Sequence, residues 1–96
     1  MIVYQVKVLV QPQIEKEWLA WMKQTHVPDL LATGLVVSSK ILRSLDDPHT
    51  YYFHYYFKSQ ADYRHYVQHH APRLQAHPLE LFGGKFEAGR KLMEMI

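Results

Sequence analysis

Cysteine is absent from the 96 residues of this sequence. Its absence excludes disulfide bonds, thiolate nucleophiles and cysteine-based zinc sites, and it is compatible with a reducing compartment. The sequence also lacks any run that approaches the roughly 18 apolar residues needed by a transmembrane helix. Its apolar start has no basic segment of the kind that opens a signal peptide, and Gln5 and Lys7 interrupt it. We therefore expect a cytoplasmic protein with no membrane partner.

Charges of the two signs nearly balance. The net charge is only +2, and charged residues make up 21% of the chain. Such a balance gives no argument for a nucleic-acid partner, and we expect none. Hydrophobic residues make up 48%, which is ordinary for a globular protein. At 96 residues the chain is expected to form a single domain, residues 1–96.

Motifs for cofactors and metals are missing as well. Gly83 and Gly84 precede a strand pattern rather than a helix, so they do not form a phosphate-binding loop. His65 and His69 have the i, i+4 spacing of a metal clamp, but no third ligand accompanies them. Arg73 and Arg90 suit either carboxylate binding or a solvated surface. We therefore expect no metal site and no dedicated cofactor.

Four segments alternate apolar and polar residues in the manner of strands. The first has one apolar and one mixed face. In the second, the apolar residues do not keep one parity, which predicts a bulge near Ser38 and Ser39. The predicted strands span residues 2–10, 35–42, 50–58 and 85–95.

Helical stripes fill the two longer gaps between these strands. The first helix begins at Pro12 and is expected to stop before Pro28, with a short turn after it. The second opens with a capping box of Ser59 and Asp62, is interrupted at Pro72, and is followed by another short turn at Pro78. Its apolar stripe is expected to consist of Tyr63, Tyr66, Val67 and His70.

The resulting order is β-α-β-β-α-β, which predicts an α+β fold. The simplest packing is a ferredoxin-like antiparallel sheet with two helices on one face. The right-handed crossover rule places both helices on the same side.

The stretch "HTYYFHYYF" places aromatic rings on both faces of the third strand. The face that meets the helices is expected to hold Tyr4, Val6, Val8, Tyr51, Phe53, Tyr55, Phe57, Phe86, Ala88 and Leu92. The open face is expected to hold Gln5, Lys7, Leu9, Tyr52, His54, Tyr56, Glu87, Lys91 and Met93. That face is too apolar to stay bare and too polar for a dry core. Three partners could bury this face: a second copy of the chain, a nucleic acid or a small ligand.

His54 lies between two phenols on this open face. An imidazole there can orient a polar ligand or relay a proton, and it can equally be an interface residue bonded to a partner. We predict that Lys7, Tyr52, His54 and Tyr56 bind a ligand. If there is a reaction, imidazoles and phenols are the groups left to catalyse it, and its rate should follow a histidine pKa near roughly 6–7.

Nearly the whole chain resembles a bacterial domain-of-unknown-function family, number 4286. The most specific pieces are the H-x-P of His26 and Pro28, "HAPRL" at residues 70–74 and "FGGKF" at residues 82–86. This family is similar to the dimeric α+β barrel group, in which two ferredoxin-like sheets face one another. The resemblance implies a homodimer through the open sheet face.

That group includes cofactor-free monooxygenases, haem-degrading enzymes, lactone isomerases and members without known activity. In some of its isomerases a histidine in the region of His26 takes part in proton transfer, so His26 joins His54 as a candidate catalytic residue. The structural alternative is that His26 caps the end of the first helix.

The sequence leaves three candidate functions. The first is a homodimeric barrel that binds a small aromatic or amphipathic molecule, and the second is a cofactor-independent monooxygenase or isomerase. The third is an RNA-binding module, since the RNA recognition motif shares this element order. RNA binding ranks last, because Gln5 and Lys7 occupy the positions of the first strand where an RNA recognition motif needs an aromatic ring to stack on a base.

Overall fold

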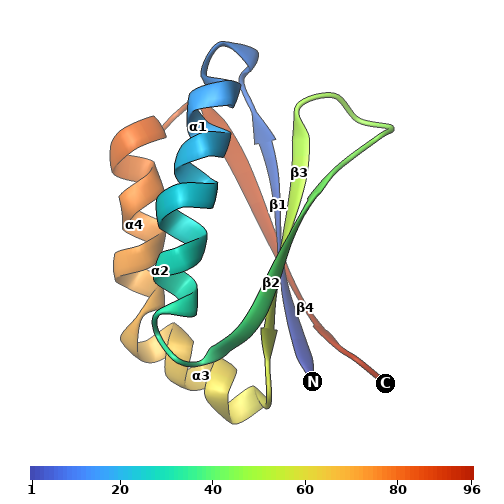
Figure 1. Ribbon diagram of the computed structural model, residues 1–96, viewed down its shortest axis with the longest axis vertical. Helices are drawn as coiled ribbons and strands as arrows, with labels where there is room; N and C mark the ends of the chain where they lie inside the picture. Colours follow the sequence, from blue (N-terminus) through green and yellow to red (C-terminus); the bar gives the residue numbers. More distant parts are fainter.

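Four strands form one antiparallel sheet in the order β2-β3-β1-β4 in the computed structural model, which describes residues 1–96. The strands are β1 (Ile2–Val10), β2 (Val36–Arg43), β3 (Thr50–Phe57) and β4 (Phe86–Glu94). Figure 1 shows all the helices on one side of this sheet, with the other side bare. The ferredoxin-like α+β fold predicted from the element order is therefore confirmed.

The first helical region is a continuous rod rather than a helix followed by a separate turn (Figure 1). It consists of η1 (Pro12–Ile14), α1 (Glu15–Trp21), the π-helical η2 (Met22–His26) and α2 (Val27–Leu31). The prediction that Pro28 ends the helix was wrong. The π-helical turn shifts hydrogen bonding, so that the Val27 N–H donates to the Met22 carbonyl. Pro28 then stands in the first turn of α2, where a missing N–H is tolerated.

The second helical region consists of α3 (Gln60–His69) and α4 (Ala71–Phe82). The predicted break at Pro72 is confirmed, because α4 begins one residue earlier. The predicted turn at Pro78 was wrong, since α4 runs through it. Leu74 and Phe82, on either side of Pro78, are both buried and hold the helix against the core.

The helix α3 begins as its capping residues predict. The Asp62 backbone N–H donates to the Ser59 hydroxyl at 3.2 Å. Tyr66 is buried on the predicted stripe, whereas Val67 is 42% exposed and does not belong to it. The apolar stripe is therefore narrower than predicted.

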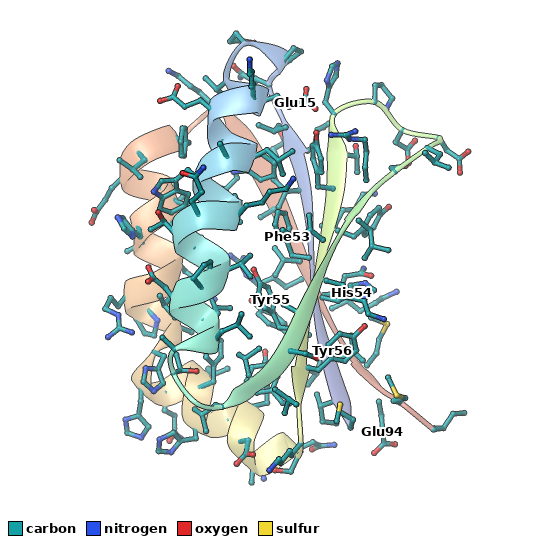
Figure 2. The ribbon with its side chains drawn as sticks, viewed as in Figure 1. Glu15, Phe53, His54, Tyr55, Tyr56 and Glu94 are labelled. Atoms are coloured by element: carbon teal, nitrogen blue, oxygen red, sulfur yellow. The ribbon has the colours of Figure 1, made fainter.

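The core lies between the sheet and the helices and is rich in aromatic rings. Trp18 meets Phe53 edge to face, with ring centroids 5.7 Å apart. In Figure 2, Phe53 and Tyr55 point toward the helices, whereas His54 and Tyr56 point away from them. The predicted division of β3 into two faces is confirmed.

The bulge predicted in the second strand is confirmed. The pairing of β2 with β3 shifts register between Val36 and Ser38, so Val37 has no partner in the ladder. After the shift, Lys40 and Leu42 lie opposite His54 and Tyr52 on the open face.

None of the helices combines the length and apolar character needed to cross a bilayer.

The packing of the core predicts how far the loss of one aromatic ring lowers the stability of the protein. Phe57 is 0% exposed, so Phe57→Ala should lower the free energy of unfolding by about 3–5 kcal/mol in urea denaturation. Leu45→Ala is the control, because Leu45 is 96% exposed and its loss should change stability by less than about 0.5 kcal/mol. Equal effects from the two substitutions would contradict this packing.

Candidate functional site

The predicted site residues lie on both sides of the sheet. Lys7, Tyr52, His54 and Tyr56 share the open face, as the strand register requires. His26 lies in the helical layer and lines the core on the opposite side. The structure therefore brings the first four together and separates the two candidate catalytic histidines, which cannot act on one small substrate at once.

A polar row crosses the open face at its middle. His54 on β3 pairs with Gln5 on β1 and with Lys40 on β2, and Gln5 also pairs with Lys91 on β4. The row thus reads Lys40, His54, Gln5 and Lys91 from one edge of the sheet to the other. Tyr56 lies on one side of this row in the same strand.

His54 is held by its neighbours in the row. Its Nε2 lies 2.9 Å from Gln5 Oε1, and its ring meets Tyr56 at 6.4 Å between centroids. Because an amide oxygen only accepts, the Nε2–H donates and Nδ1 keeps its lone pair. Partial burial, aided by the positive charge of Lys40, lowers the pKa of His54. The ring is therefore neutral near pH 7.

The tyrosines of the open face carry lysines over their rings. Lys7 Nζ lies 5.9 Å from the centroid of Tyr52, and Lys40 Nζ lies 5.7 Å from that of Tyr56. Such cation–π contacts are weak at exposed sites, on the order of 0.5–1 kcal/mol. They keep the ammonium groups over the face without neutralising them.

His26 occupies a different setting, at the end of the π-helical turn η2. Its ring stacks on Trp21, with centroids 5.6 Å apart. Its Nδ1 is buried without a hydrogen-bond partner. Burial lowers the pKa of His26 to about 4, with Asp29 opposing and His77 adding to the shift. The expected capping role at a helix end was wrong, because the rod continues through α2.

His26 lines a cavity of about 50 Å³ between the sheet and the helices. Its walls come from β1, β3, β4 and all the helical segments except η1. Apolar groups predominate, and the polar residues are few. The residues around it include Val6, Val8, Trp18, Met22, Leu30, Phe53, Tyr55, Tyr66, Pro78, Phe86 and Ala88.

Tyr4, Gln75 and Arg90 supply further polar groups to this cavity. The Arg90 Nε–H donates to the Tyr4 hydroxyl at 3.0 Å. Burial raises the pKa of Tyr4, and Arg90 acts against that shift. Sequence reasoning treated Tyr4 as core and did not connect it with Arg90. Strand parity could have revealed the contact, because Arg90 lies on the same face of its strand as Phe86 and Ala88.

The histidines of α3 gather without forming a metal centre. The rings of His65 and His69 have centroids 4.3 Å apart. No group of three or more His, Cys, Asp or Glu side chains is arranged to hold a metal ion. His70 Nδ1 is buried without a partner, beside an open cleft that Arg73 also lines.

Solved structures share this fold at low sequence identity. An antibiotic biosynthesis monooxygenase has a TM-score of 0.73 at 16% identity, covering 100% of this chain and 99% of that one. HapK from Hahella chejuensis has a TM-score of 0.76 at 13% identity, covering 100% and 93%. A mutant of SnoaB, a cofactor-independent oxygenase from Streptomyces nogalater, has a TM-score of 0.73 at 13% identity, covering 98% and 92%.

Likeness at this level of identity establishes the fold alone, the ferredoxin-like fold of dimeric α+β barrel proteins. No curated protein matches the chain. The family model described as "Domain of unknown function (DUF4286)" matches residues 1–96. The match covers every residue, so the chain belongs to the DUF4286 family.

Proposed function

We propose that this protein is a homodimeric α+β barrel that binds a small aromatic or amphipathic molecule between its sheet and its helices. The observation that carries the proposal is the buried, unpartnered Nδ1 of His26 beside a largely apolar cavity. Leaving a buried polar atom unbonded costs about 1–3 kcal/mol. A ligand that donates a hydrogen bond to Nδ1 would recover that cost. Apolar walls with a few fixed polar groups are typical of small-molecule sites.

A phenol matches these walls. Its ring is apolar and flat enough to pack against Phe53 and Phe86, and its hydroxyl is a donor for His26 Nδ1. The cavity of about 50 Å³ holds a few waters, whereas apolar cavities that accept benzene are on the order of 150 Å³. Entry of a ring therefore needs outward movement of α4. Pro78 lines the cavity from α4 and removes one of the hydrogen bonds that would stiffen it.

The proposed homodimer is supported by exposed apolar residues on the open face. Leu9 and Leu42 are 47% and 42% exposed there, and Leu42 lies opposite Tyr52. Stacking the same face of a second chain would cover these groups by a two-fold interface, as in most small oligomers. Likeness to dimeric barrel proteins supports this arrangement.

A cofactor-independent oxygenase or isomerase is the second candidate, with His26 as the proton acceptor once a substrate bound beside it raises its pKa from about 4. A neutral imidazole near pH 7 can accept a proton from a phenol, and the resulting phenolate would raise the pKa of the histidine beside it. SnoaB, which shares the fold, is described as a cofactor-independent oxygenase. The separate prediction that His54 is the acid or base remains as the competing assignment.

A pair of probes tests the binding site. We expect 2-naphthol to quench Trp fluorescence and to bind more tightly than naphthalene, because only the former donates to Nδ1. His26→Phe should weaken 2-naphthol by about 10-fold and leave naphthalene unchanged, as expected for one hydrogen bond. His54→Gln should change neither affinity. Loss of binding in His54→Gln but not in His26→Phe would move the ligand to the open face.

The depressed pKa of His26 predicts acid sensitivity. The folded pKa of about 4 lies below the unfolded value of 6.5, so protonation favours unfolding as the pH falls from 6.5 toward 4. The loss should be about 2–3 kcal/mol, and it should shrink in His26→Phe but not in His65→Gln. NMR titration of the His26 ring in the folded protein should give a midpoint near pH 4, whereas a histidine in the unfolded chain titrates at roughly pH 6–7. A midpoint above 6 would contradict the burial of this ring.

The dimer has its own test. Leu9→Glu should weaken association on the order of 100-fold, because it would bury an unpaired carboxylate in each copy. Leu79→Glu is the matched control, since Leu79 is 58% exposed on α4, away from the open face. Light scattering over a dilution series checks both. A wild-type mass of 11.4 kDa at high micromolar concentration would overturn the homodimer.

A further inference from the structure

We propose that the open sheet face holds a second site, which takes the anionic group of a small aromatic molecule. The site consists of Lys7, Gly89 and Lys91 on β1 and β4, next to Gln5 and His54 of the polar row. Lys40 lies three strands away from Lys91 and adds only positive potential at longer range. This inference rests on the proposed homodimer for its enclosure, since a second copy would close over the row. It does not depend on the cavity at His26.

Charge on this face is unbalanced. The register places Lys7, Lys40 and Lys91 on the open face, with Glu87 as its acidic residue. The one ion pair of the chain, between His49 and Glu15, lies elsewhere, so no carboxylate pairs with these lysines. A two-fold interface doubles the excess of positive charge. Burying unpaired charges is costly, and an anion held between the sheets would remove that cost.

Gly89 marks where such a group would meet the backbone. It lies in the middle of β4, directly opposite Lys7. A Cβ added there would meet nothing within 4 Å, so the packing of this chain does not demand glycine. Glycine within a strand weakens it and is typical of places where a ligand approaches closely. A shallow groove of about 280 Å³ runs past it, lined also by Lys7, Leu9 and Glu87.

The surroundings of the row suit an aromatic body. Tyr52, which pairs with Lys7, is partly exposed on this surface, whereas Tyr56 is only 9% exposed. Gln5 holds the His54 ring in place through its 2.9 Å hydrogen bond. An anion beside Lys7 and Lys91 would therefore find ammonium donors next to the ring of Tyr52, which selects for a carboxylate or similar group on an aromatic ring.

Two probes of nearly equal shape, one anionic and one neutral, test the site. We expect 2-naphthoate to bind at least 10-fold more tightly than 2-naphthamide in calorimetric titration, and to tighten the dimer. Lys91→Gln should reduce naphthoate affinity at least 10-fold, whereas Lys16→Gln, on α1, should not. Arg90→Gln should also leave it unchanged, which separates this site from the cavity. Equal affinities for the two probes, or an unchanged Lys91→Gln variant, would overturn the proposal.

Gly89→Ala gives an independent check. Because the added methyl meets nothing within the chain, thermal stability should stay the same or rise, while naphthoate affinity falls at least 10-fold. Wild-type affinity in a stable Gly89→Ala variant would exclude close approach at this strand and overturn the site.

Light scattering on the same samples separates this proposal from the dimer. A monomer that still binds naphthoate through Lys91 would remove the homodimer and keep the anion site. A dimer without preference for the anion would remove the site and keep the homodimer.

Discussion

The antiparallel pairing of β1 with β3 is the constraint on which the rest of this structure depends. Every second residue of β3 is a buried ring under the helices, and the alternate residues Tyr52, His54 and Tyr56 must face the other way. A slip of one residue would exchange these sets and expose the core rings. The burial of Phe53, Tyr55 and Phe57 therefore fixes which groups the open face presents.

The helical rod adds a second constraint, because a π-helical turn interrupts it at Met22–His26. Such turns widen a helix and are less favourable than regular ones, and they are often found at functional sites. Here the turn ends at His26 and lets the rod continue past Pro28. Its buried imidazole makes a stacking contact with Trp21 but no hydrogen bond through Nδ1. The fold thus carries an unfavourable polar atom next to a cavity, which is the reverse of what stability alone would select.

The cavity and the open face are built on the same strands. Tyr4 and Gln5 are neighbours on β1, and Arg90 and Lys91 are neighbours on β4, yet each pair divides between the two sides of the sheet. The pleat sends successive side chains in opposite directions, so one short segment supplies both sites. In Figure 2, the same division is visible at Tyr55 and His54. A single sheet therefore separates two chemically different surfaces by the thickness of one backbone.

The sequence by itself determined the element order, the bulge in β2 and, by parity, which residues of the strands share each sheet face. These follow from local periodicity, which a period of two residues encodes directly. It also placed Lys7, Tyr52, His54 and Tyr56 on one surface. Only the tertiary structure decided that the helices run through Pro28 and Pro78. The π-helical turn places Pro28 in the first turn of α2, where a missing N–H is tolerated, and the packing of Leu74 and Phe82 against the core outweighs the cost of Pro78 inside α4. It alone joined Arg90 to Tyr4 and buried His26 at a cavity, since contacts between residues far apart in the chain leave no periodic signal in either segment.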